Sequence, residues 1–176
     1  MTNAGSLTIE ASGELEIVMT RVLDAPRTMV FDAFTKPELV KRWLLGPDGW
    51  TMPVCEIDLR VGGRYKYVWR RESNGKEMTM TGTYKEIAPP ERVVSTESFE
   101  DPWYPGEAIT TVRLAEHAGK TTVVQTMHLP TREARDGVLK SGMESGVEVS
   151  YKRLEPILVE LASRGSGDNH KGVTGA

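Results

Sequence analysis

The 176-residue sequence predicts an α+β fold in which a seven-stranded, curved antiparallel sheet wraps around a long C-terminal helix. Between Met52 and Leu129, apolar and polar residues alternate in short runs that turn signals separate, as in antiparallel strands. Between Thr131 and Ser163, apolar residues recur every three or four positions, as in an amphipathic helix. A sheet of this size must bury one apolar face, and the final helix is the element available to cover it.

The segment before residue 52 predicts one strand and two short helices. Residues 15–23 are rich in β-branched side chains, which favour a strand. Pro26 suits the first position of a helix, because its missing N–H has no partner there. Pro37 ends that helix and begins a second one, which contains Trp43. Two short helices therefore follow the first strand.

Six further strands are expected between Met52 and Leu129. In one of them Tyr65, Tyr67 and Trp69 alternate with basic residues, so the aromatic face is expected to point inward. The turns between the strands are marked by Gly62–Gly63, Asn74–Gly75, Pro89–Pro90, Pro105–Gly106 and Gly119.

The C-terminal segment from Thr131 to Ser163 is expected to form a long amphipathic helix, with Pro156 bending it or removing one hydrogen bond. Gly142 and Gly146 each cost about 1 kcal/mol relative to alanine inside a helix. Either they allow a close approach or pocket volume, or they mark a broken start of the helix. The apolar stripe comprises Leu139, Met143, Val147, Tyr151, Leu154, Leu158 and Leu161.

The sequence predicts a single domain over residues 14–164, with disordered tails at 1–13 and 165–176, both short, polar and glycine-containing. Cys55 is the one cysteine, so no intramolecular disulfide can form and a cytoplasmic location is expected. No apolar stretch approaches the roughly 18 residues of a membrane helix, so no membrane partner is expected.

Composition and charge narrow the classes of partner. The chain is 39% hydrophobic and 27% charged, as in ordinary globular proteins. A net charge of −3 provides no cationic surface for phosphates, which argues against nucleic acid. The three histidines lack metal-ligand spacing, so neither a metal nor another cofactor is expected.

Four segments, at residues 21–44, 55–67, 82–94 and 141–161, resemble the heat-shock-protein-90 ATPase activator homologue-like (AHSA-type) branch of the START-related SRPBCC superfamily. The motifs that carry the resemblance are Ala25-Pro26-Arg27, Trp43, Asp58-Leu59-Arg60-Val61-Gly62-Gly63-Arg64 and Pro89-Pro90-Glu91-Arg92, together with the final helix. The resemblance covers about residues 15–162 and implies the helix-grip fold. Members of this superfamily include lipid carriers, hormone receptors, polyketide cyclases or aromatases, and co-chaperone domains, so the fold alone does not decide the function.

A cavity is expected between the sheet, the short helices and one end of the long helix. Tryptophan and tyrosine combine an apolar body with a polar group, which suits an aromatic or amphiphilic ligand. Glu97 and His128 could serve as acid or base if they face the cavity, although pairing with strand neighbours or water is favoured. The candidate ligand-binding residues are Trp43, Tyr65, Tyr67, Trp69, Phe99, His128, Met143, Val147 and Tyr151.

Three functions follow from these patterns, and no catalytic residue is assigned. Binding of a hydrophobic or aromatic small molecule comes first. A cyclase or aromatase is the alternative, and it requires Glu97, His128 or a tyrosine to point inward. A chaperone ATPase-stimulating domain comes third, and an exposed patch containing Trp103 and Tyr104 would favour it. The glycine-rich segment 58–64 is interpreted as a turn. The sequence does not decide whether the protein forms a homodimer.

Overall fold

The computed structural model describes residues 6–102 and 104–168, which form eight strands and four helices. The strands are β1 (Thr8–Ser12), β2 (Glu16–Leu23), β3 (Trp50–Ile57), β4 (Arg64–Arg71), β5 (Glu77–Ala88), β6 (Arg92–Phe99), β7 (Ala108–His117) and β8 (Lys120–His128). The helices are α1 (Arg27–Thr35), α2 (Pro37–Trp43), α3 (Arg132–Lys140) and α4 (Met143–Asp168). Within this described part of the chain, no helix is long and apolar enough to cross a membrane.

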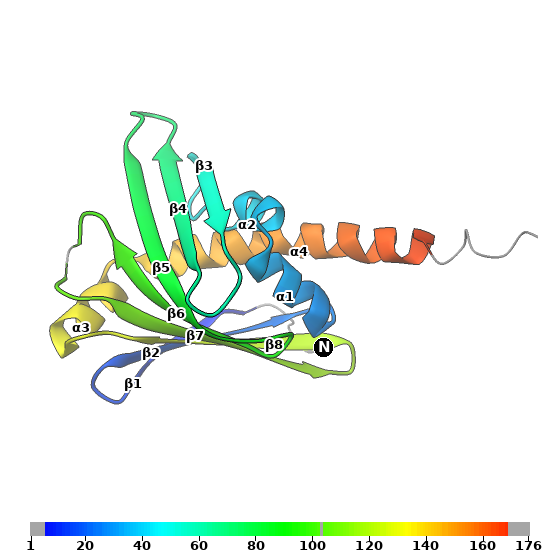
Figure 1. The fold of residues 1–176 in the computed structure, drawn as a ribbon, viewed down its shortest axis with the longest axis horizontal. Helices are drawn as coiled ribbons and strands as arrows, with labels where there is room; N and C mark the ends of the chain where they lie inside the picture. The colour runs from blue at the N-terminus through cyan, green and yellow to red at the C-terminus, as the bar shows by residue number, and fades with distance from the viewer. Residues whose placement is uncertain (1–5, 103, 169–176) are drawn as a thin grey trace, which may run out of the picture.

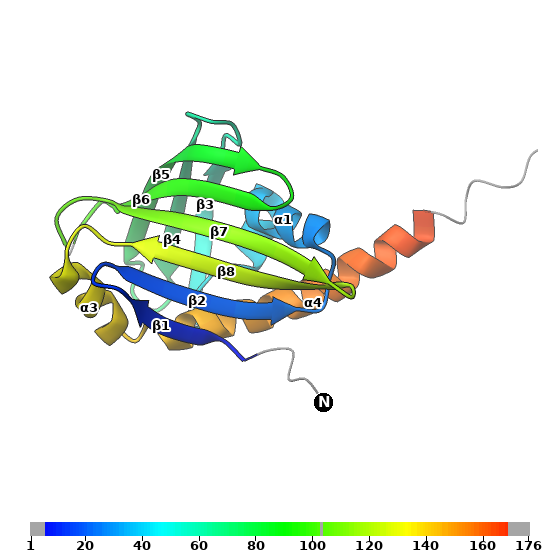
Figure 2. The ribbon, with the colours of Figure 1, turned by 90° about the horizontal axis from the view of Figure 1, so that it is seen from below.

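All eight strands belong to one antiparallel sheet in the order β1-β2-β8-β7-β6-β5-β4-β3. The sheet bends strongly, so that β3, β4 and β5 stand steeply over the layer formed by β2, β8 and β7 (Figure 1). Helix α4 runs across the concave side, and α1 and α2 lie at the same side near its middle (Figures 1 and 2). The α+β class, the curved antiparallel sheet and the long C-terminal helix are thereby confirmed, and they fit the helix-grip fold.

The expected number of seven strands is wrong, because the segment expected to be a tail contains strand β1. Its sequence, Thr8–Ser12, holds one large apolar residue and gives no alternating signal. An edge strand of this kind is held by main-chain pairing with β2, which composition does not reveal. Gly13, with φ of 56°, supplies the hairpin turn between the two strands. The described part of the sheet therefore begins before residue 14.

The expected C-terminal helix is broken near its start, one of the two alternatives that the sequence left open, and it divides into α3 and α4. Gly142 has φ of 79°, a left-handed conformation that ends a helix and that glycine adopts without a steric penalty. At the other end of α3, the Thr131 side chain accepts a hydrogen bond from the Ala134 amide at 3.0 Å. Helix α4 continues through Pro156 to Asp168, beyond residue 165, where a disordered tail was expected. Residues 169–176 of that tail lie outside the described residues.

Helix α4 packs through a buried stripe opposite α1 and α2. Trp43 stacks on Tyr151 with ring centroids 5.7 Å apart, and Phe34 contacts Trp43 edge-on at 5.0 Å. The Trp43 indole N–H donates to the Ala33 carbonyl at 2.9 Å, so the buried ring leaves no polar atom unmatched. The stripe on α4 is formed by Tyr151, Leu154, Ile157 and Leu158, all buried.

A buried arginine joins the first long strand to α4. Arg21 is only 1% exposed, and its guanidinium pairs with Glu148 at 3.2 Å and with Glu155. The same group lies 5.6 Å from the centre of the Tyr151 ring. A guanidinium removed from water requires such partners, so this cluster fixes where α4 crosses β2.

Gly82 allows a tyrosine ring to lie flat against the sheet. A Cβ atom at this position would come within 2.3 Å of the Tyr65 ring and 2.0 Å of the Thr96 carbonyl oxygen. That carbonyl accepts a hydrogen bond of 2.7 Å from the Tyr65 hydroxyl. The glycine therefore creates the space in which Tyr65 spans from β4 to β6.

We expect Gly82→Ala to lower the free energy of unfolding by about 1–3 kcal/mol, the usual cost of overpacking a well-packed site. Gly165→Ala is the control, because no atom lies within 4 Å of the added methyl group in α4. Urea unfolding followed by circular dichroism measures both. Equal stability of Gly82→Ala and the wild type would contradict the packing described for Tyr65.

We expect the double substitution of Glu148 and Glu155 by alanine to cost about 3–5 kcal/mol, because it leaves a buried guanidinium without an anion. Arg21→Met should cost less, since both carboxylates are partly exposed and water can solvate them. Urea titrations of the two variants give the comparison, with Glu144→Ala as an exposed control on α4. A larger loss for Arg21→Met would contradict this assignment of the desolvation cost.

Candidate functional site

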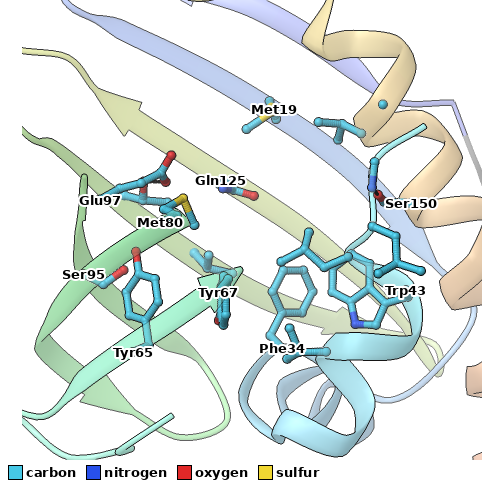
Figure 3. Close-up of a pocket in the computed structure, with 18 of the residues that line it drawn as sticks. Met19, Phe34, Trp43, Tyr65, Tyr67, Met80, Ser95, Glu97, Gln125 and Ser150 are labelled. Carbon is cyan, nitrogen blue, oxygen red and sulfur yellow. Dashed lines mark hydrogen bonds between the residues drawn. The ribbon is translucent and has the colours of Figure 1, made fainter. Parts of the chain in front are cut away.

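An apolar pocket of about 520 Å³ lies between the concave face of the sheet, α1, α2 and the first half of α4. It is there because the sheet bends away from the helix along β4 and β5. In Figure 3, Tyr65, Ser95 and Glu97 lie on one side of the space and Phe34 and Trp43 on the other. The aromatic residues that line it are Phe31, Phe34, Trp43, Trp50, Tyr65, Tyr67, Trp69, Tyr84 and Tyr151.

Seven of the nine candidate ligand-binding residues line this pocket. They come from three regions of the fold, since α2, β4 and α4 converge on the space. Their role in binding remains a prediction. The seven are Trp43, Tyr65, Tyr67, Trp69, Met143, Val147 and Tyr151.

His128 does not line the pocket, contrary to its selection as a ligand-binding residue. Side chains alternate between the two faces of a strand, and Met127 is buried on the concave face. His128 therefore points to the opposite face, where its side chain is 47% exposed and its Nδ1 lies 3.5 Å from a Glu16 carboxylate oxygen. Pairing with a strand neighbour was the interpretation favoured from the sequence.

Phe99 is likewise not among the pocket residues. It lies at the end of β6, opposite Met80 of β5. There it packs, partly buried, against a second apolar cluster that includes Met52 and Tyr67. Phe99 thus supports residues of the pocket wall without lining the space.

Glu97 faces the pocket, which the sequence disfavoured. Its carboxylate accepts a hydrogen bond of 3.1 Å from the Thr110 hydroxyl. Burial raises the pKa of Glu97, and the Thr110 hydrogen bond opposes that rise. The pocket therefore holds one acidic group whose neutral form is favoured by burial.

Further polar groups in the pocket were missed by sequence reasoning. Ser95 and Thr110 face each other across β6 and β7, and Gln125 lies on β8 two residues from the buried Met127. The signal that could have found them is the period of two, counted from a buried neighbour. Burial raises the pKa of Tyr67 and Tyr151, so their hydroxyls stay protonated and uncharged near neutral pH.

The loop between α2 and β3 forms one rim of the pocket. The Trp69 indole donates to the Leu44 carbonyl at 2.7 Å, and the Gly46 amide donates to the Ser150 hydroxyl at 2.9 Å. Gly146 lets the loop approach α4, because a Cβ there would lie 3.2 Å from a Pro47 side-chain carbon. The exposed members of the lining are Pro47, Arg71 and Met78, so the pocket opens beside this loop.

Other candidate chemistry lies outside the pocket. Cys55 is half-buried, and burial raises its pKa to about 11, so it is almost entirely a thiol at neutral pH. The described residues contain no group of three or more side chains arranged to hold a metal ion.

Two further segments named from the sequence can be placed. The 58–64 segment is a turn. The Arg60 side chain donates a hydrogen bond of 2.8 Å to the Asp58 carboxylate, and the Asp58 backbone amide donates one to the Arg64 carbonyl. Tyr104 is buried in the main core, so it does not form an exposed patch. Trp103 lies outside the described residues.

Comparison with known proteins places the chain in a family. A protein from Rhodobacter sphaeroides has 27% sequence identity and a TM-score of 0.82, covering 88% of this chain and 98% of its own. A Chromobacterium violaceum protein has 31% identity and a TM-score of 0.69, covering 81% and 96%. None of the curated proteins matches this sequence. The family described as "Activator of Hsp90 ATPase homolog 1-like protein" matches residues 24–159, and the chain belongs to that family.

Proposed function

We propose that the protein is a binding domain that holds a hydrophobic or amphiphilic small molecule between its sheet and α4. The observation that carries the proposal is the apolar, aromatic-lined pocket of about 520 Å³. Ligand sites of this size are mostly apolar, with a few polar groups that orient the ligand. The family's fold is compatible with such a role.

The aromatic lining supports this function over a purely structural one. The indole rings of Trp43 and Trp69 lie at the pocket. The Trp43 N–H donates a hydrogen bond to the Ala33 carbonyl, and the Trp69 N–H donates one to the Leu44 carbonyl. Their ring faces are then available for apolar contact without leaving a polar atom unmatched. An empty space lined in this way forfeits contacts that a ligand would restore.

Catalysis of the cyclase or aromatase type is the second candidate, and the position of Glu97 favours it. A carboxyl group in a shaped apolar pocket could transfer a proton to or from a bound, folded chain. The two functions differ in what leaves the protein, because an enzyme releases a molecule chemically different from the one that it bound.

Contact with a chaperone is the third candidate function. The family name supports it, and it would require a binding surface on the outside of the protein. We also propose a cytoplasmic location, on the single cysteine, and no nucleic-acid or membrane partner, on the net charge and the composition.

The direct test is native mass spectrometry of freshly purified protein, followed by denaturing extraction of any bound molecule. A stoichiometric apolar adduct supports the proposal and identifies the ligand class. A protein that is reproducibly free of adduct and also fails to bind naphthalene-type probes contradicts it.

We expect Val147→Trp to reduce binding of such an adduct or probe at least about tenfold, because the indole occupies pocket volume next to Tyr151. Val159→Trp is the matched control, since Val159 also lies on α4 but is 70% exposed and outside the pocket. Isothermal titration calorimetry measures both variants. Unchanged affinity in folded Val147→Trp would place the binding site elsewhere.

A further inference from the structure

The pocket has a polar floor on the sheet side, formed by Ser95 and Glu97 of β6, Thr110 of β7 and Gln125 of β8. Figure 3 shows Glu97, Ser95 and Gln125 reaching into the space, the first two from β6 and Gln125 from β8. Strand pairing sets Ser95 opposite Thr110, and Gln125 lies one strand further on. The facing wall, formed by Phe34 and Trp43, is apolar. A bound molecule therefore meets two chemically different sides.

Part of this floor lacks an internal partner. Ser95 is hydrogen-bonded to the Tyr65 hydroxyl, and Thr110 donates to Glu97. The Gln125 side-chain amide has no hydrogen-bond partner among the described residues. Among the described residues, the one fully buried side-chain polar atom without a partner is Arg21 Nε, so the Gln125 amide is accessible from the pocket, where a polar atom of a bound molecule can hydrogen-bond to it.

The Glu97 carboxyl group on the floor, whether ionised or protonated, has no cationic partner among the described residues that line the pocket. Of the two arginines that line the pocket, Arg71 lies exposed at the rim over the Trp50 ring, and Arg92 pairs with Glu86. Neither forms an ion pair with Glu97 within the described part of the chain. An anionic group at the floor would therefore meet a carboxyl and no compensating charge.

We propose that the pocket selects an uncharged, hydroxyl-bearing ring compound, with its hydroxyl against Glu97 and Gln125 and its ring among Phe34, Trp43 and Tyr67. The inference rests on the proposed binding function and names the ligand class of the same site. A hydroxyl both donates and accepts, so it matches the Gln125 amide and either protonation state of Glu97. A carboxylate only accepts, and it would repel the ionised form of Glu97.

The test compares three ring probes of matched size: 2-naphthol, 2-naphthoate and the ammonium form of 2-(aminomethyl)naphthalene. Affinities are measured by isothermal titration calorimetry at pH 7. We expect 2-naphthol to bind at least about tenfold more tightly than 2-naphthoate, because the anion must be desolvated beside a carboxyl group. The ammonium probe should also bind more weakly than 2-naphthol, because the ammonium group loses its hydration in the apolar pocket and burial favours the neutral form of Glu97, which offers it no counter-charge.

Glu97→Gln removes the acid while keeping the shape of the side chain. We expect the preference for 2-naphthol over 2-naphthoate to shrink to about threefold or less, mainly because 2-naphthoate gains affinity. Glu107→Gln is the matched control, since Glu107 is an exposed carboxylate outside the pocket, and it should leave the preference unchanged. Gln125→Leu provides a second variant and should weaken 2-naphthol binding about fivefold.

The outcomes separate this inference from the proposed function. Equal or tighter binding of 2-naphthoate or the ammonium probe to the wild-type protein overturns the selection of an uncharged hydroxyl compound, while pocket binding stands. A preference that persists in Glu97→Gln, with 2-naphthol affinity unchanged in Gln125→Leu, also overturns it. Binding of none of the probes counts against the binding function itself.

Discussion

The concave face of the sheet is larger than one helix can cover, and the other features of the fold follow from this mismatch. Helix α4 buries the side near β2, where Arg21 fixes its position and Leu154 packs fully buried. Strands β4 and β5 bend away beyond its reach (Figure 1). Helices α1 and α2 cover part of the remainder with Phe34 and Trp43. The space left between them is the pocket, so its size depends on the sheet's curvature.

The sequence was sufficient for the elements whose side chains carry a periodic signal. Strands β2 to β8, both short helices and the long helix follow from alternation, from proline positions and from the apolar stripe on α4. Strand β1 was missed because main-chain pairing holds it, and main-chain hydrogen bonds leave no compositional trace. The break at Gly142 depends on a left-handed backbone, one of two states that glycine occupies without penalty, so sequence left both alternatives open.

The candidate site was predictable on its aromatic side and not on its polar side. Tyr65, Tyr67 and Trp69 share a face in a strand whose other face is basic, so their inward orientation follows from the pattern. Glu97 and His128 lie in strands with weaker alternation, and their orientation depends on register. A shift of one residue exchanges the two faces, and here the register sends Glu97 inward and His128 outward.

Methyl NMR of the methionines tests the central claim, that a ligand occupies the space between the sheet and α4. Met19, Met80, Met127 and Met143 line the pocket, whereas Met29 and Met52 do not. On titration with 2-naphthol, ¹³C-methyl signals of the first four should shift, owing to the ring current of the bound probe, while those of Met29 and Met52 stay in place. Shifts confined to Met29 and Met52, or no shift at saturating probe, would contradict the account.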